Sequence, residues 1–524
     1  MALGPKIILF FVFDVYLSLA KTDLDFFKDR HKNEENSYTP NRSGFTVYPP
    51  SHQNTTSPPT HYPIKNHQPN NQQSSEEQDF IYIHSQPPPA TFYSTDLSFR
   101  FTNVGLQRIG RDFITSDSII SLSLDSNNIS DISPFAFRSM RNLRHLNLSK
   151  NRIPIQKLLV LHGNDKLQTL IINDNDGSYD DSSNSEFVIE HETFTNLKHL
   201  HLCNNRLQNF KMPFYIATPT LNHLHLCNNS ISSTSAVFDN IPATLTHLNL
   251  NKNLIDRVER EKLRYLQDLS MDDNKIIQVC FEDCGEESIS LKGADRMQNL
   301  SLSRNQIAEV TLDAFYDMRY LLKLDLSGNR IADLAKGTFN KTLFINELSL
   351  AHNFLAAVPD VCPMQHLKSL NLTGNRISAI FLDTFCRLKR LEFLYLSDNT
   401  LTTIEPRAFH LERLTHLDLS GNRLKQLPAQ WIYAWQTRIS ILELNLERNN
   451  FTDLDDMSLR NINSLRNVYV DKNPMLKLRA EAFELLPGQL TLHLKNVRVE
   501  CAQCQCKDDD EQDNDDEDNE DDDY

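Results

Sequence analysis

The sequence predicts an α/β repeat solenoid, a fold in which one short unit is stacked many times. Two observations indicate it. The pattern LxxLxLxxN recurs along most of the 524 residues, for example as LLKLDLSGN at residues 321–329. Its ninth position is asparagine in all fifteen units, a column that chance does not produce. Because each unit of a solenoid packs only against its neighbours, a chain of this length does not need several separate domains.

The units follow one another at a nearly constant spacing, which is mostly 24 residues. Position one of the pattern lies at Ile119, Leu143, Leu167, Leu197, Leu221, Leu245, Leu266, Met297, Leu321, Ile345, Leu367, Leu391, Leu414, Ile441 and Leu465. This regularity predicts that equivalent positions of neighbouring units lie side by side.

Each position of the unit has an expected structural role. Positions four to six are expected to form a short strand with inward leucines, so that positions three, five and seven face outward on one surface. The chain turns after the strand, where the side-chain amide of position nine can satisfy buried backbone groups. A phenylalanine six residues before the next unit is expected to fill the wider back of the coil, as at Phe137, Phe315, Phe339 and Phe385.

This pattern resembles the leucine-rich-repeat superfamily, specifically its 24-residue extracellular class, which is familiar from Toll-type receptor ectodomains and from secreted insect proteins. The resemblance covers roughly residues 95–500. It implies a horseshoe with a parallel β-sheet on its concave side. It also implies ligand binding, usually of a protein, rather than catalysis.

The first 20 residues have the features of a cleaved secretory signal. Lys6 gives a basic start, residues 7–13 are apolar, and Ser18 and Ala20 are small residues at the minus-three and minus-one positions of a cut. No later stretch approaches the ~20 apolar residues of a spanning helix, so we expect no membrane span in the mature chain. The expected location is therefore secreted and extracellular.

Further segments flank the array. Residues 21–94 are rich in Pro, Asn and Gln and are expected to form a disordered arm. We interpret residues 95–118 as a degenerate capping repeat, residues 119–489 as the array of about 15 repeats, and residues 490–507 as a C-terminal cap with a cysteine cluster. Residues 508–524 are expected to be a disordered acidic tail, which is either simply solvated or captures calcium weakly or docks on a basic partner.

Two units are longer than the others. The third contains a polar insertion at residues 176–186, and the seventh contains one at residues 278–296. Insertions in such arrays emerge as loops, often on the functional face, although a tolerated surface bulge is the favoured interpretation of the first.

The register of the repeat predicts disulfide pairs among the nine cysteines. Cys203 and Cys227 share position seven of adjacent units, and Cys362 and Cys386 both lie five residues before position one. Equivalent positions on stacked coils are roughly 5 Å apart, within the range that a disulfide needs. Cys280 and Cys284 could close a small loop in the second insertion. The remaining cysteines are Cys501, Cys504 and Cys506, so one is left over and could link two chains in a homo- or heterodimer.

A dense group of histidines is the first candidate site. Units four and five both read HLHLCNN, and their outward positions, with one from the next unit, hold His199, His201, Cys203, His223, His225, Cys227 and His247. Three uses are open: an ordinary polar ligand face, a pH-responsive contact, and a zinc site made by His201, His225 and two thiolates. Because the expected compartment oxidises thiols, the first use is favoured and no metal is assigned.

A group of aromatic residues is the second candidate site. Phe393 and Tyr395 lie on unit twelve, and His416 and Tyr469 lie on later strands. Aromatic side chains on a rigid sheet are typical binding anchors, although a packed aromatic ladder is the alternative.

Glycosylation sequons limit which surface is accessible. They begin at Asn41, Asn54, Asn128, Asn147, Asn228, Asn299, Asn340, Asn371 and Asn450. Asn147, Asn299 and Asn371 occupy outward strand positions, where sugars would obstruct the concave face. Units four to six and twelve to fifteen are expected to be the clearest areas.

Charge and motifs exclude other functions. The net charge is −16, but residues 508–523 carry 13 acidic side chains, which leaves −3 for the rest of the chain. Without a clustered basic surface, no nucleic-acid partner is expected. The chain has no G-x-S-x-G, P-loop or HExxH motif, and His191-Glu192 lacks the second histidine of a zinc protease. We therefore expect neither an enzyme nor a cofactor.

These features together predict a secreted module that recognises an extracellular protein ligand or receptor through its concave face, in innate immunity or cell signalling. The alternative is an extracellular-matrix or cell-adhesion protein. No motif names the partner.

Overall fold

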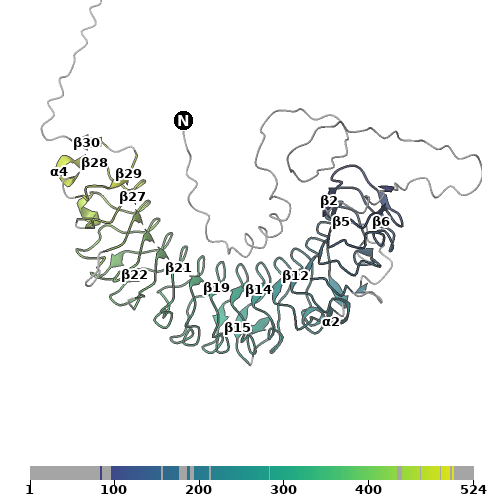
Figure 1. The fold of residues 1–524 in the computed structure, drawn as a ribbon. Helices are drawn as coiled ribbons and strands as arrows, with labels where there is room; N and C mark the ends of the chain where they lie inside the picture. The colour runs from purple at the N-terminus through teal and green to yellow at the C-terminus, as the bar shows by residue number, and fades with distance from the viewer. Residues whose placement is uncertain are drawn as a thin grey trace, which may run out of the picture.

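The dominant element is a parallel sheet to which almost every repeat contributes one strand. In chain order its strands are β2 (Leu97–Arg100), β5 (Ile119–Ser123), β7 (His145–Asn147), β8 (Thr169–Ile171), β10 (His199–His201), β12 (His223–His225), β13 (His247–Asn249), β14 (Asp268–Ser270), β17 (Asn299–Ser301), β19 (Lys323–Asp325), β20 (Glu347–Ser349), β21 (Ser369–Asn371), β23 (Phe393–Tyr395), β25 (His416–Asp418), β26 (Glu443–Asn445), β27 (Asn467–Tyr469) and β29 (Thr491–His493). Figure 1 shows these strands along the inner curve of an arc. The predicted horseshoe with a parallel concave sheet is confirmed.

The computed structural model describes residues 83–84, 96–154, 157–175, 186–188, 194–211, 214–282, 284–386, 388–433, 439–460, 462–483, 486–495 and 498–500. The expected signal segment and acidic tail lie outside these residues, as do Asn41, Asn54, Cys501, Cys504 and Cys506. Within the described part of the chain, no helix is long and apolar enough to cross a membrane.

The strands occupy positions three to five of the repeat, one residue earlier than expected. Lys323, Leu324 and Asp325 pair with Glu347, Leu348 and Ser349 in exact repeat register. The leucines of positions four and six still point into the core, as predicted, because Leu324 and Leu326 are fully buried. Side chains at positions three and five therefore lie on the concave surface, and neighbouring strands bring like positions together.

The asparagine column forms a continuous hydrogen-bonded ladder on the side where the strands end. The Asn329 amide donates to the carbonyls of Leu302 and Leu326, both at 2.9 Å, and its Oδ1 accepts from the Ile307 amide at 3.1 Å. One side chain therefore satisfies backbone groups of two coils. Fourteen of these asparagines are buried, and Asn473 at the end of the column makes the same contacts while partly exposed.

The convex side is made of short strands, turns and single-turn helices. Its strand pairs are β3 (Arg108–Ile109) with β6 (Asp131–Ile132), β22 (Ala379–Ile380) with β24 (Thr403–Ile404), and β28 (Lys477–Arg479) with β30 (Arg498–Glu500). Its helices are α2 (Phe214–Ala217), α3 (Ser235–Phe238), α4 (Ala480–Phe483) and the 3-10 turn η2 (Asp455–Met457).

Buried phenylalanines fill the space behind the sheet, as the repeat predicts. Phe315 and Phe339 stack with ring centroids 5.6 Å apart, and Phe385 and Phe409 stack at 5.7 Å. These rings are wider than the leucines of the strand side. They let the convex side of each coil be broader than the concave side, which accounts for the curvature.

The second insertion is not a loop, contrary to expectation. It contributes β15 (Gln278–Cys280) and β16 (Ser288–Ser290), which pair with each other, while β15 also pairs with β18 (Glu309–Val310). Ile289 is fully buried and bridges to Val258 of the preceding coil. That coil spans only residues 245–265 and has no back strand of its own there, so the insertion completes it.

Strands also lie in segments that were assigned differently from the sequence. Ile83 and His84, in the expected arm, form β1 and pair with β4 (Ile114–Thr115). The end of the first insertion forms β9 (Glu186–Val188), which pairs with β11 (Asn209–Lys211). The main sheet continues into β29, within the segment assigned to the C-terminal cap, because Leu492 takes the inward position of another repeat.

Candidate functional site

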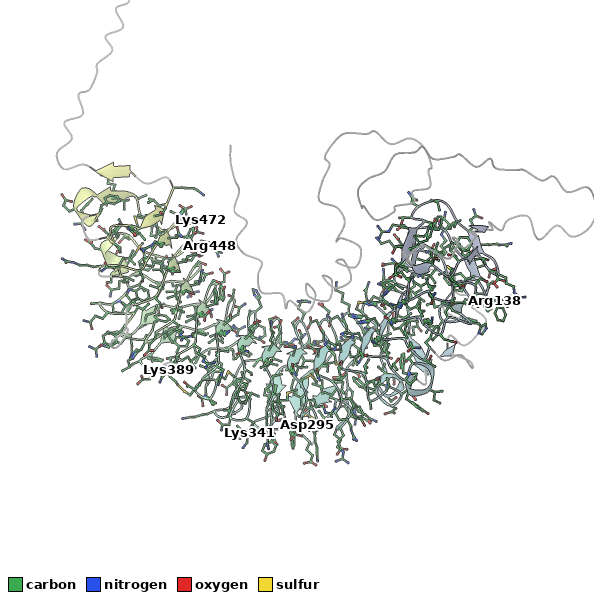
Figure 2. The ribbon with its side chains drawn as sticks, in the orientation of Figure 1. Arg138, Asp295, Lys341, Lys389, Arg448 and Lys472 are labelled. Carbon is green, nitrogen blue, oxygen red and sulfur yellow. A yellow bond between two sulfur atoms is a disulfide. The ribbon has the colours of Figure 1, made fainter. Side chains whose placement is uncertain are left out.

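The concave face consists of rows of side chains that run across the strands. Position three forms one row, in which His199 lies beside His223 and His223 beside His247. Position five forms the next row, in which His201 lies beside His225. In Figure 2, Arg448 and Lys472 lie along the inner curve near the C-terminal end, while Asp295 and Lys341 lie on the outer curve. A ligand on the inner curve would therefore contact many repeats at once.

The five predicted histidines do form one cluster. In the position-three row, the ring centroids of His199 and His223 are 4.4 Å apart, and those of His223 and His247 are 4.0 Å apart. In the position-five row, His201 and His225 stack at 4.2 Å with nearly parallel planes. Parallel strands at a spacing near 4.8 Å impose this stacking on identical residues in register.

The end of the imidazole stack is fixed by a carboxylate that sequence reasoning missed. His247 Nε2 lies 2.9 Å from Asp268 Oδ2, and its Nδ1 lies 2.8 Å from the Thr246 hydroxyl. Asp268 occupies position three of the next repeat. Reading position three of one further repeat in the sequence would have identified Asp268 as the neighbour of His247.

Burial separates the histidines into two kinds. His201 and His225 are only 6% and 7% exposed, whereas His199, His223 and His247 are half-buried. His201 and His225 therefore offer little surface to a ligand, contrary to expectation, because each ring is covered by its stacked neighbour. Burial, followed by the charge of neighbouring imidazoles, lowers the pKa of His201 and of His223 to about 3. These two imidazoles are thus held neutral at pH 7.

The hypothetical zinc site is wrong, because its thiolates are consumed. Cys203 and Cys227 form a disulfide with a Cα–Cα distance of 4.6 Å. A disulfide sulfur has no thiolate with which to bind zinc. The two cysteines instead link β10 to β12 covalently just after the imidazole pair.

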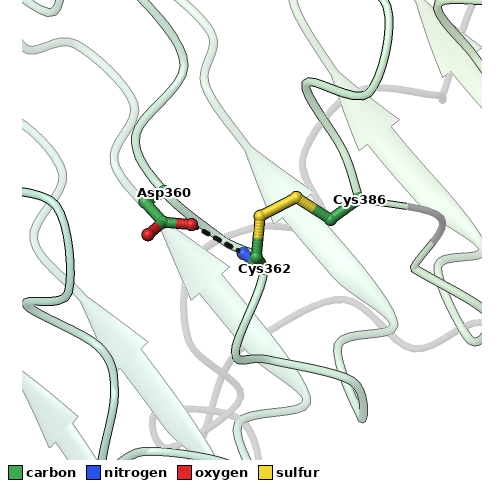
Figure 3. Close-up of side chains that lie close together, drawn as sticks. All are labelled: Asp360, Cys362 and Cys386. Atoms are coloured by element: carbon green, nitrogen blue, oxygen red, sulfur yellow. Dashed lines mark hydrogen bonds between the residues drawn. A yellow bond between two sulfur atoms is a disulfide. The ribbon is translucent and has the colours of Figure 1, made fainter.

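The other two expected disulfides are also present. Cys280 is joined to Cys284 in the second insertion, and Cys362 is joined to Cys386 across adjacent coils with a Cα–Cα distance of 5.2 Å. Among the described residues, Asp360, Cys362 and Cys386 are the one group whose metal-ligand atoms lie close together (Figure 3). Their sulfurs are bonded to each other, and Asp360 accepts from the Cys362 amide at 3.2 Å, so this group is a cross-link rather than a metal centre.

The predicted aromatic group is divided in the structure. Phe393 stacks on His416 at 4.7 Å, with Tyr395 beside it on β23. Tyr469 is not adjacent: it lies three strands from Tyr395 and stacks on His493 at 4.4 Å. The sequence hypothesis missed His493 because residue 493 falls within the segment assigned to the cap. One aromatic pair therefore lies on β23 and β25 and the other on β27 and β29, with β26 between them.

Carboxylates occupy the space between the aromatic pairs. His416 Nε2 lies 3.5 Å from Glu443 Oε2, and its Nδ1 lies 2.8 Å from the Thr415 hydroxyl. Asp418 sits between Tyr395 and Asn445 in the position-five row. Burial raises the pKa of Tyr395 to about 12, and Asp418 and Glu443 add to this effect. Burial likewise raises the pKa of Tyr469, with contributions from Glu443 and Glu447.

Comparison with known proteins bears on both the repeat and the fold. The model of the leucine rich repeat family matches residues 118–176, 295–355, 345–401 and 365–424. These units are leucine-rich repeats. A chain of the glycosylated Toll–Spätzle complex of Drosophila is 20% identical, with a TM-score of 0.57, over 73% of this chain and 52% of that chain. A leucine-rich-repeat protein of Leptospira interrogans is 19% identical, with a TM-score of 0.53, over 75% of this chain and 95% of that chain.

A curated relative is similar over a shorter region. Tsukushi of Xenopus tropicalis is 30% identical over 131 residues, which is 21% of this chain and 37% of Tsukushi. The match thus spans little more than a third of that protein. Together with the low identities to solved structures, it supports the leucine-rich-repeat fold and no particular ligand.

The leucine-rich repeats place three sequons on the concave sheet. Asn147, Asn299 and Asn371 lie on β7, β17 and β21 and are half-buried. Asn371 neighbours Tyr395 directly across the sheet. Asn128, Asn228, Asn340 and Asn450 are exposed. A sugar on Asn371 would border the Phe393–His416 pair, whereas no sequon lies on β23, β25, β26 or β27.

Proposed function

We propose that this leucine-rich-repeat protein is a secreted binding module that recognises an extracellular protein ligand or receptor through its concave face, in innate immunity or cell signalling. The observation that carries the proposal is the face itself, a rigid parallel sheet that presents half-buried aromatic and imidazole side chains along an inner curve. Such side chains lose little conformational entropy on binding, so they are typical interface anchors.

Several further observations support extracellular protein recognition. The first 20 residues are typical of a secretory signal, and the described part of the chain carries three disulfides and four exposed sequon asparagines, Asn128, Asn228, Asn340 and Asn450. A structural relative belongs to the Toll–Spätzle complex, in which two proteins associate. No catalytic role is proposed, because the sequence carries no catalytic motif.

Secretion is tested by expressing the tagged chain in animal cells. Most of the protein is expected in the medium, with its mature N-terminus at Lys21 and with a mass that falls on enzymatic removal of N-linked sugars. Retention in the cell with an intact N-terminus would contradict the proposal. Non-reducing electrophoresis of the same sample tests the disulfide-linked dimer, which should collapse to the monomer on reduction.

Ligand recognition is tested by affinity capture from extracellular fluid with three charge-changing variants. His223→Glu and Tyr395→Arg alter the two halves of the concave face, while Asp295→Arg alters an exposed residue on the outer curve (Figure 2). A specific ligand should survive Asp295→Arg and be lost with at least one concave variant. Loss with the outer variant alone would overturn the assignment of the concave face. Capture of collagens would favour the matrix or adhesion alternative.

A further inference from the structure

The number of charged side chains on the concave face changes along the array. On β7, β8, β10, β12 and β13, the residues at positions three, five and seven include no Asp, Glu, Lys or Arg. On β23, β25, β26, β27 and β29, the same positions hold the four carboxylates of Asp418, Glu443, Glu447 and Asp471 and one ammonium, that of Lys495. The strands between these two sets, β14 to β21, hold Asp268, Asp272, Asp325 and Glu347 with Lys323 at the same positions, so the face is acidic from β14 onwards. The C-terminal strands differ from the middle ones because aromatic side chains lie beside their carboxylates.

The C-terminal strands carry one group of side chains that we call the acidic–aromatic patch: Phe393, Tyr395, His416, Asp418, Glu443, Glu447 and Tyr469. Phe393 and Tyr395 border it on one side and Tyr469 on the other. Three strand steps separate the two tyrosines, which is roughly 14 Å at about 4.8 Å per strand. Asp418 and Glu443 lie on the two strands between them.

Cations of the chain itself leave the middle of this patch accessible. Arg448 is paired with Asp398 at 3.1 Å, and Lys495 is paired with Asp471 at 3.3 Å, both towards its margin. Glu443 contacts His416, whose Nε2 lies 3.5 Å from Glu443 Oε2. Asp418 accepts from the Ser420 amide at 2.9 Å, and burial raises the pKa of its carboxyl above the usual value.

We propose that the acidic–aromatic patch binds a basic segment of the protein partner, in which at least two arginine or lysine side chains lie within about five residues. The inference rests on the proposed binding function and specifies the chemistry of the partner. A guanidinium or ammonium placed between the tyrosines meets carboxylates directly and lies within cation–π range of a ring face. An extended segment of about four to five residues spans the roughly 14 Å between the rings.

The direct test uses a fluorescent peptide of alternating arginine and glycine that carries a photo-crosslinking side chain. Because residues 508–523 also attract cations, the contact site is identified by mass spectrometry of cross-linked full-length protein. Cross-links are expected within residues 391–471. Cross-links confined to residues 508–524 would overturn the inference.

Matched variants measure the contribution of the patch. The double variant Asp418→Asn/Glu443→Gln should reduce these cross-links about tenfold, since each lost charge contact weakens binding several-fold. Glu347→Gln removes a carboxylate that pairs with Lys323 at 3.1 Å elsewhere on the sheet, and it should leave the cross-links unchanged. Equal effects of both variants would show that only overall charge matters, which would also overturn the inference. Circular dichroism of each variant verifies folding.

The two proposals fail in different ways. If a captured natural ligand is lost with His223→Glu but retained with Tyr395→Arg and with the double variant, the basic-segment inference is wrong while concave recognition stands. If capture of every ligand is unaffected by both His223→Glu and Tyr395→Arg, the proposed function is wrong, regardless of where the peptide cross-links.

Discussion

Asparagine at position nine is the residue on which the fold depends most. Asn329 stabilises two coils, because its amide donates to carbonyls of its own coil and the preceding coil while its oxygen accepts from an amide. Leucine could replace its volume but none of these contacts. Buried backbone groups without partners are costly, which explains why one residue type fills the column.

Asn329→Ala is therefore expected to lower the free energy of unfolding by about 3 kcal/mol, since it leaves buried backbone groups unpaired at roughly 1–3 kcal/mol each. Urea denaturation followed by fluorescence measures the change. Asn463→Ala, at an exposed site on a turn, is the control and should change stability by less than about 0.5 kcal/mol. Similar values for both variants would contradict the role given to the ladder.

Histidine at position three gives the chain a defined response to acid. The pKa of His223 is lowered to about 3 by burial and by the charges of His247 and His199. The unfolded chain therefore binds a proton between pH 6.5 and about 3 that the folded chain does not bind. Stability is fully present above about pH 6.5 and falls as the pH drops through this window.

His223→Asn should remove its share of this pH dependence, by up to one proton per molecule, whatever its effect at pH 7. The measurement is the urea midpoint at several pH values between 7 and 4, since the slope against pH counts protons. Asn463→Ala, which alters an exposed residue that does not titrate, should keep the slope of the unaltered protein. An unchanged slope in His223→Asn would show that this imidazole remains freely titratable in the folded state.

At the scale of the element, β16 shows how a length change becomes structure. Coil six is shorter than the common 24 residues and coil seven is longer, and the extra residues of the second supply the back strand that the first lacks. Ile289 is consequently part of the core. The insertion, which was expected to be a surface loop, therefore supplies a strand that the preceding coil lacks.

Ile289→Ala should destabilise the protein by about 3 kcal/mol, because truncation of a buried isoleucine leaves a cavity. Leu312→Ala, at a residue that is 57% exposed on the next coil, should have almost no effect. Thermal unfolding of the two variants makes the comparison. If Ile289→Ala is as stable as Leu312→Ala, residues 281–290 form a dispensable loop after all.

The repeat made the strands, the concave rows and the stacking of like residues predictable, because all three follow from one register. His199, His223 and His247 are examples. Contacts between non-equivalent positions of different repeats were not predictable in the same way, because the register does not bring such positions together. The pairing of β16 with two coils depends on unequal unit lengths, and the distance between Tyr395 and Tyr469 depends on counting strands rather than residues.

At the scale of the whole molecule, stability is distributed in one dimension. Each strand of the main sheet pairs only with its immediate neighbours, and the edge strands β2 and β29 each pair with one strand. Damage at one coil therefore propagates through adjacent coils only. The histidine cluster and the acidic–aromatic patch are consequently independent in stability.

Hydrogen–deuterium exchange of Ile289→Ala tests this independence. Faster exchange is expected in β14 to β18 and their immediate neighbours, while amides of β5 and β27 should exchange as in the unaltered chain. A uniform acceleration along the whole array would indicate that the solenoid unfolds as a single cooperative unit.

The disulfides between adjacent coils have a mechanical consequence. Cys203–Cys227 and Cys362–Cys386 each join residues 24 positions apart. When the ends of the protein are pulled apart, each bond keeps one coil out of the stretched length, which is roughly 80 Å of extended chain at 3.3–3.6 Å per residue. Reduction of both disulfides would make this chain available for extension, so the reduced molecule would be roughly 160 Å longer at full extension. The two disulfides therefore limit how far the oxidised protein can be extended by force.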